Sequence, residues 1–240
     1  MPRARDRKDP SRTPGGDRTA VSRSVYREYG EAILIAAIFL WFANTFILQT
    51  FYIPSGSMED TLLIGDHLFV NRFIYGASLD SPIEKLLPLR PVHRGDIVVF
   101  RSKETPEIDV VKRCIGVPGD EIRIEEKVVF LNGKQVDDSA YAHHISPLLE
   151  RGRDNFGRFV VPEGHYFFMG DNRDFSHDSR FWGALPAHLI KGRAEIIYWS
   201  YGGRMASEDA SGWDRLTQLG RTARGFLTKS RWSRTFRLVR

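Results

Sequence analysis

Two serines flank a glycine in the stretch PSGSMEDTL, residues 54–62, which has neither the period of a helix nor the alternation of a strand. A serine acts as a nucleophile only beside a base that takes its proton, so the chemistry of Ser55 and Ser57 depends on a partner elsewhere in the chain. No G-x-S-x-G motif surrounds Ser57, and the seven histidines are scattered. Without a partner, the stretch is an ordinary Ser/Gly turn.

A lysine inside an apolar run is the candidate base. Lys112 lies in VVKRCIGV, residues 110–117, and the period of a strand places it on the same face as Val110 and Cys114. Burial there would disfavour the ammonium and lower the pKa of Lys112, so that the amine could accept a proton. The alternative is a lysine on an edge strand that faces solvent. Arg113 is expected to be exposed and Cys114 to be a small buried residue.

A third polar segment, GDNRDFSHDSRFWG at residues 170–183, directly follows an apolar run. Its short polar side chains could orient a lysine amine through hydrogen bonds. Asp178 and Arg180 could pair and hold the segment in place. The alternative is an Asx-rich turn with a salt bridge and no further role.

The elements that must position these residues are mainly strands. Asn132-Gly133 between apolar runs predicts a hairpin, since a type I′ turn needs positive φ at both central residues. Residues 137–160 are polar and are expected to be an excursion at the surface. The predicted strands are 96–101, 110–117, 121–124, the two arms of 127–136, 165–169 and 194–201.

Composition and charge narrow the class of protein. The 240 residues include one cysteine, so no intrachain disulfide can form and the fold must rest on a buried core. The chain carries 35 Lys and Arg against 30 Asp and Glu, but the excess is at the two ends. A nucleic-acid-binding protein should carry its basic groove on the folded body, so this function is not expected. No metal or cofactor is expected either.

A long uncharged stretch predicts one membrane helix. No charged residue or histidine occurs between Ala32 and Met58, and 33–53 is almost entirely apolar, which is long enough to cross a bilayer. We therefore predict a transmembrane helix over residues 29–53. The arginine-rich segment 1–28 is expected to be a largely disordered cytoplasmic tail, which places the body, 54–203, on the other side.

The C-terminal residues 204–240 combine aromatic and aliphatic side chains at roughly helical spacing with many arginines. They predict a basic amphipathic tail that lies on an anionic bilayer surface and takes no part in the active site. A solvated, disordered tail is the alternative.

Taken together and in this order, the membrane stretch, PSGSMEDTLLIGD, RGDIVVF, VVKRCIGVPGD and GDNRDFSHDSRFWG resemble bacterial type I signal peptidase over roughly residues 30–203. The resemblance implies that Ser57 is the nucleophile and Lys112 the general base. It makes Ser55 an oxyanion donor beside the Ser57 N–H. Asp60 stands where this family usually has proline.

The resemblance implies further roles for side chains around these two residues. Ser176 would orient Lys112, and Asp178 with Arg180 would brace the loop. Apolar side chains would line pockets for the residues one and three before the cut, which favours Ala-X-Ala in the substrate. The five expected pocket residues are Phe51, Ile53, Leu62, Val110 and Val111.

The implied fold is a mainly antiparallel β body with a smaller inserted β region, which would include residues 137–160, preceded by one transmembrane helix. The implied activity is cleavage of signal peptides from secretory preproteins through an acyl-enzyme, at the bacterial inner membrane. The lipid bilayer would be its other partner, with no obligate protein partner. Two alternatives stay open, namely a membrane-tethered β domain that only binds a partner and a different Ser-Lys protease.

Overall fold

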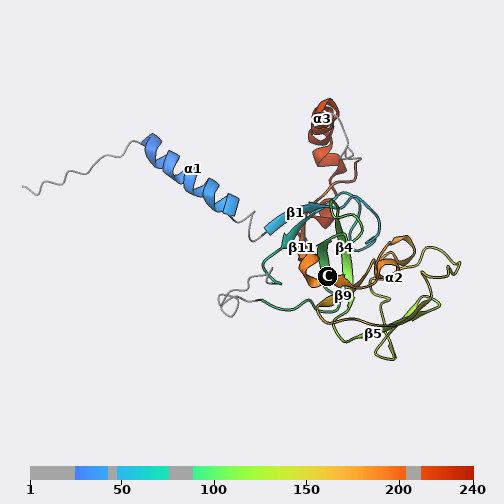
Figure 1. Ribbon diagram of the computed structural model, residues 1–240. Coiled ribbons are helices and arrows are strands. Elements are labelled where there is room, and N and C mark those ends of the chain that lie inside the picture. Colours follow the sequence, from blue (N-terminus) through green and yellow to red (C-terminus); the bar gives the residue numbers. More distant parts are fainter. Residues whose placement is uncertain (1–24, 43–47, 76–88, 204–211) are drawn as a thin grey trace, which may run out of the picture. The chain divides into compact units, whose positions relative to one another are not determined.

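The computed structural model describes residues 25–42, 48–75, 89–203 and 212–240, and antiparallel strands dominate the body (Figure 1). The main sheet has the order β1-β2-β11-β3-β4-β9-β10, and β12 also pairs with β11. Its strands are β1 (Leu48–Tyr52), β2 (Asp66–Asn71), β3 (Ile97–Arg101), β4 (Asp109–Gly116), β9 (His165–Met169), β10 (Leu185–Pro186), β11 (Ile190–Ser200) and β12 (Arg237–Leu238).

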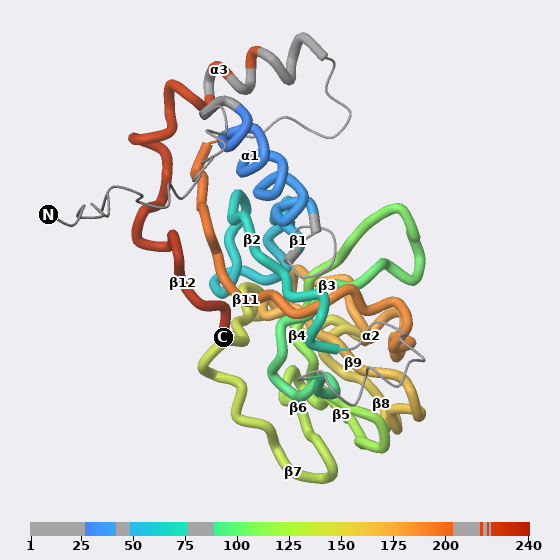
Figure 2. The backbone as a smooth tube through the Cα atoms, turned by 90° about the vertical axis from the view of Figure 1, so that its left-hand side faces the viewer, coloured from blue at the N-terminus to red at the C-terminus, as the bar shows by residue number. Residues whose placement is uncertain are grey.

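A second, smaller sheet has the order β7-β6-β5-β8 and lies at one end of the body (Figure 2). Its strands are β5 (Glu121–Glu125), β6 (Val128–Leu131), β7 (Lys134–Gln135) and β8 (Phe156–Val160). The predicted hairpin is present, because Asn132 and Gly133 have φ of 52° and 77° and join β6 to β7. The mainly antiparallel β body with a smaller β region is therefore confirmed.

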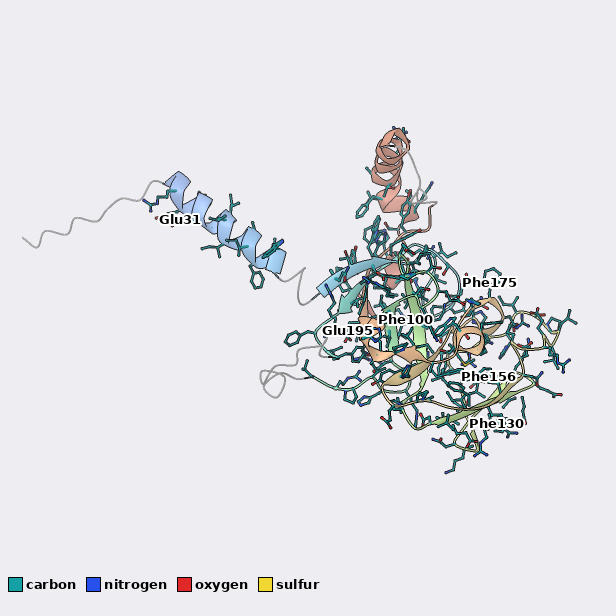
Figure 3. All side chains as sticks on the ribbon, viewed as in Figure 1. Glu31, Phe100, Phe130, Phe156, Phe175 and Glu195 are labelled. Carbon is teal, nitrogen blue, oxygen red and sulfur yellow. The ribbon has the colours of Figure 1, made fainter. Side chains whose placement is uncertain are left out.

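Apolar side chains form three buried clusters that hold the two sheets. One contains Ile53, Met58 and Leu62 together with residues of β2, β3 and β11. A second lies on the opposite face of β3 and β4 and includes Phe100 and Cys114. The third joins the small sheet to β9. Figure 3 shows Phe100 within the main sheet and Phe130 and Phe156 at the small one.

Strand β8 shows how part of the polar segment joins the smaller β region, as the family resemblance implies. Residues 156–160 pair with β5 rather than lying as an irregular excursion, since Ile122 lies opposite Phe159 and Ile124 opposite Phe156. The aromatic side chains Phe156 and Phe159 pack against the third cluster. Phe156 and Phe159 are three residues apart, which breaks the two-residue period of a strand, and the pairing with β5 is irregular between Ile122 and Ile124, so alternation gives no strand signal here. The rest of 137–160 is largely irregular.

The predicted helix over 29–53 is wrong at its C-terminal end. Helix α1 (Val25–Phe42) ends eleven residues before the predicted end at residue 53. Residues Leu48–Tyr52 instead form β1, which pairs with β2 from Leu48↔Asn71 to Tyr52↔His67. A hydropathy pattern shows that a segment is apolar, but it does not show whether a strand elsewhere in the chain is available to pair with it. None of the described helices is both long and apolar enough to cross a membrane. Most of the predicted N-terminal tail lies outside the described residues.

The C-terminal tail differs from its prediction in its last eleven residues. Helix α3 (Gly212–Lys229) is followed by a segment that packs on the body through β12, and Val239 is only 6% exposed. Phe226 of α3 lies 5.7 Å from Trp199 of β11, measured between ring centroids. The last eleven residues therefore belong to the body, because their apolar and basic side chains have partners there that the local pattern does not reveal.

Candidate active site

Ser57 lies in the loop between β1 and β2. Backbone hydrogen bonds close the loop at its base, from Ile53 N to Asp66 O (2.9 Å) and from Gly65 N to Ile53 O (3.0 Å). A tight turn follows the serine, in which Leu62 N donates to Met58 O over 2.7 Å. Met58 and Leu62 anchor this turn because both are buried in the first apolar cluster. Ser57 is half-buried at the edge of a cleft.

Lys112 comes from the middle of β4, opposite Val98 of β3. Its side chain is buried (3% exposed), and its Nζ lies 2.5 Å from Ser57 Oγ. The predicted face is confirmed, because Val110 and Cys114 belong to one apolar cluster on that side of the sheet. The structure thus brings together a hydroxyl and an amine that are 55 residues apart in the chain.

Burial of Lys112 lowers its pKa from 10.5 to about 8. Removal of water is the main cause, because an ammonium loses more solvation than a neutral amine. The negative charge of Asp178 acts in the opposite direction and raises the pKa, while the charge of Arg180 lowers it. A substantial fraction of the amine is therefore neutral near pH 8 and able to accept a proton.

Asp178 and Arg180 form the predicted brace. Arg180 donates two hydrogen bonds of 2.8 Å to the two carboxylate oxygens of Asp178, and both side chains are buried. Asp178 also accepts from Gly170 N at 3.0 Å and caps α2 (Ser179–Trp182). Burial is the largest single influence and raises the pKa of Asp178, but the hydrogen bonds and charge of Arg180 together with the hydrogen bonds from Ser176 and Gly170 outweigh it, so the pKa lies below its ordinary value.

Ser176 belongs to the same network. Its hydroxyl donates to Asp178 Oδ2 over 2.6 Å and forms no hydrogen bond with Lys112. The serine still packs close to the nucleophile loop, because a Cβ on Gly170 would lie 2.4 Å from both Ser176 Oγ and Ser57 O. Only glycine permits this approach, so Gly170 is a packing requirement of the site that its position in the motif does not reveal.

The loop after β9 also holds the nucleophile segment by its backbone. Asn172 N donates to Ser57 O at 3.2 Å, and Asn172 Nδ2 donates to Gly56 O at 3.3 Å. These bonds constrain the peptide groups on both sides of Ser57, including the one that contains its N–H. Sequence reasoning did not single out Asn172, although an asparagine within a dense polar motif was the available signal.

The prediction that Arg113 is exposed is wrong. Arg113 is 3% exposed and forms a bidentate ion pair with Asp171, with N–O distances of 2.8 and 2.7 Å. Asp171 also accepts from Thr61 Oγ1 at 2.6 Å. The guanidinium of Arg113 lies over the Tyr141 ring, 4.1 Å from the ring centroid. Both faces of β4 are covered at this point, so alternation cannot reveal which side is solvent.

The cleft beside Ser57 and Lys112 has a volume of about 330 Å³. Phe100, Val110 and Trp182 give it an apolar lining, and Ser55, residues 102–105 and Ile108 also line it. Ser55 is exposed, so its hydroxyl is accessible from the cleft. An extended peptide can enter beside the serine because the cleft is open.

The five expected pocket residues separate into two groups. Val110 lines the cleft on the lysine face. The other four meet in the first apolar cluster, where Ile53 and Leu62 are buried and Phe51 and Val111 pack against them half-buried. Phe51 and Val111 are therefore accessible in part, whereas Ile53 and Leu62 could only form the base of a pocket.

A serine hydroxyl and a buried amine within hydrogen-bond distance, in an open cleft of a β body, are the parts that a serine hydrolase needs. Comparison with known proteins gives the family. The family model for signal peptidase, peptidase S26, matches residues 26–199 of this chain. The chain therefore belongs to the signal peptidase family, peptidase S26, and is a serine endopeptidase.

Two sequence relatives agree with this assignment, those from Pseudomonas fluorescens and Aquifex aeolicus. Signal peptidase I of Pseudomonas fluorescens is 34% identical over 206 residues, with 72% of each chain covered. Signal peptidase I of Aquifex aeolicus is 34% identical over 222 residues, 70% of this chain and 81% of that protein. A crystal structure of a signal peptidase I from Enterococcus faecalis is 28% identical, with a TM-score of 0.35, and covers 43% of this chain and 97% of its own.

Proposed function

We propose that the chain cleaves N-terminal signal peptides from exported preproteins, with Ser57 as nucleophile and Lys112 as general base. The observation that carries this proposal is the 2.5 Å separation of Ser57 Oγ from a buried amine whose pKa is lowered to about 8. Membership of the signal peptidase family gives the class of substrate. It also favours this function over a partner-binding domain or a different Ser-Lys protease.

The reaction follows from these positions. Neutral Lys112 takes the proton of Ser57 Oγ while that oxygen attacks the carbonyl carbon of the scissile bond. The resulting oxyanion accepts hydrogen bonds from the Ser57 N–H and from the Ser55 hydroxyl. Protonated Lys112 then gives the proton to the leaving amine, and the signal peptide stays attached to Ser57 as an ester. Water activated by Lys112 hydrolyses that ester and restores both groups.

The braced loop keeps the lysine ready for this exchange. The charges of Asp178 and Arg180 neutralise each other in their ion pair. The Asp178 carboxylate is therefore not free to pair directly with the Lys112 amine. Ser176 is bonded to the same carboxylate. A free carboxylate beside Lys112 would hold it in the protonated form and suppress its function as a base.

We also propose that the apolar stretch that begins within α1 at Ile33 and continues beyond the helix in the sequence anchors the enzyme at a bilayer, with the preceding basic residues in the cytoplasm and the catalytic body on the periplasmic side. Seven large apolar side chains of α1 are between 56% and 69% exposed, namely Ile33, Leu34, Ile35, Ile38, Phe39, Leu40 and Trp41. Such a surface is unfavourable in water. Protease protection of the full chain in inverted and right-side-out vesicles tests the anchor and its orientation.

The direct test of the catalytic proposal is cleavage of a purified preprotein by the wild type, Ser57→Ala and Lys112→Met side by side. We expect one cut after the signal peptide by the wild type and no cut by either variant. Circular dichroism of the variants controls for folding. Full activity in either variant would disprove the role of that residue.

A further inference from the structure

The last eleven residues of the chain, 230–240, lie along the loop that carries Ser57 and are called here the C-terminal strap. β12 within the strap pairs with β11, and Val239 N donates to Glu195 O at 2.9 Å. The side chain of Val239 enters the same apolar cluster as Met58 and Leu62. The strap thus shares a core with the turn that follows the nucleophile.

A buried carboxylate beside this turn depends on the strap for its counter-charge. Asp66 is fully buried, and Arg234 Nη2 lies 2.6 Å from its Oδ2. Arg231 is a more distant partner, with its Nη1 3.8 Å from Asp66 Oδ1. Ser200 Oγ and Leu63 N also donate to the carboxylate, at 2.6 and 2.9 Å. A buried carboxylate is stable only when it is paired in this way.

The same two arginines hold the nucleophile loop by its main chain. Arg234 Nη2 donates to Thr61 O at 2.9 Å, and Arg231 Nη2 donates to Ile64 O at 2.9 Å. Thr61 is four residues beyond Ser57, and its hydroxyl is bonded to Asp171. Arg234 therefore fixes one end of the turn whose other end carries the nucleophile.

The far end of the strap reaches the strand that carries the base. Arg113, the neighbour of Lys112 on β4, donates from Nη2 to Arg240 O at 3.3 Å. One continuous segment thus contacts both elements whose separation sets the distance from Ser57 Oγ to Lys112 Nζ.

We propose that the C-terminal strap positions the nucleophile relative to the base, with Arg234 as its main positioning residue. This inference rests on the proposed function of Ser57 and Lys112. Loss of Arg234 should let the turn shift, and misplacement by about 1 Å is enough to cost on the order of 10²-fold in rate. The substrate cleft lies on the lysine face and does not include Arg234, so the effect should fall on kcat rather than KM.

The test compares full-length Arg234→Met, Arg234→Lys and Arg237→Met with the wild type. Arg237 is the matched control, because it is an exposed arginine of the same segment. The first readout is kcat and KM on a purified preprotein. The second is hydrogen exchange at the amides of Leu62 and Asp66, which donate to Met58 O and Leu63 O within the loop.

We expect Arg234→Met to lower kcat by about 10- to 100-fold with KM nearly unchanged, and to speed exchange in the loop but not in β5 and β6. Arg234→Lys keeps the charge but not the forked guanidinium that reaches Asp66 and Thr61 O together. Its kcat should therefore lie between those of the wild type and Arg234→Met. Arg237→Met should match the wild type.

Unchanged exchange and kcat in a folded Arg234→Met would overturn the inference, as would an equal loss in Arg237→Met. If Arg234→Met does not fold, Arg234→Lys decides, and wild-type kcat and exchange in that variant would overturn the inference. Failure of the wild type to cleave the preprotein would disprove the proposed function instead. Loop exchange would still report whether Arg234 holds the segment.

Discussion

Replacement of Lys112 by methionine should change stability in a way that depends on pH. The pKa of Lys112 falls from 10.5 to about 8 on folding because its side chain is buried. At about 1.4 kcal/mol for each pKa unit, keeping the ammonium in the folded state costs about 3 kcal/mol at pH 7. Methionine has similar length and no charge, so the variant does not carry this cost.

The direction in which stability changes with pH follows from proton binding by the folded and unfolded chains. Between pH 8 and 10.5 the unfolded wild-type chain holds a proton on Lys112 that the folded chain has lost. Wild-type stability should therefore rise with pH across this window, by about 3 kcal/mol in total from this group. Relative to the wild type, Lys112→Met should be most favoured near pH 7 and should lose that advantage above pH 10.

Urea unfolding of full-length wild type and Lys112→Met, followed by tryptophan fluorescence at pH 7 to 10.5, measures this difference. Contributions from groups that titrate alike in both proteins cancel. Lys134→Met, at an exposed position of β7, is the control for the removal of a lysine elsewhere. A stability difference between wild type and Lys112→Met that stays constant with pH, or changes in the opposite direction, would refute the lowered pKa.

Three further predictions concern the oxyanion, the brace and specificity. Ser55→Ala should fold and lose about 10² to 10³ in kcat with little change in KM, and a raised KM at constant kcat would mean that Ser55 positions substrate. Arg180→Ala leaves Asp178 buried without its partner and should lower the free energy of unfolding by about 3 to 5 kcal/mol, measured by urea unfolding; a change below about 1 kcal/mol would contradict the brace. In a preprotein series varied one and three residues before the cut, alanine should be cleaved best, and efficient cleavage after leucine or lysine would disprove the apolar pockets.

The sequence predicted correctly the features that depend on residues close together in the chain. Strand alternation placed Lys112 on the face of Val110, and the Asn132-Gly133 turn gave the hairpin, because both depend on neighbours in the chain. The family resemblance supplied the pairing of Ser57 with Lys112, which no local period encodes.

Features that depend on distant partners were missed. Arg113 was expected at the surface, since its partner Asp171 is 58 residues away in the chain. The strap is the part of the predicted membrane tail, 204–240, that instead packs on the body, because the partner of Arg234 is Asp66, which is distant in the sequence. The strand at 48–52 was assigned to a membrane helix, since apolar content alone does not separate a bilayer from a sheet.

The pH dependence of kcat/KM on a purified preprotein tests the central claim most directly, because it reports the ionisation of the base in the free enzyme. The wild-type rate should rise with pH through an apparent pKa near 8, as Lys112 loses its proton. Lys112→Arg should be inactive over the whole range, since a guanidinium stays protonated. Substantial cleavage by Lys112→Arg, or a wild-type profile without the acidic limb, would contradict the assignment of Lys112 as the base.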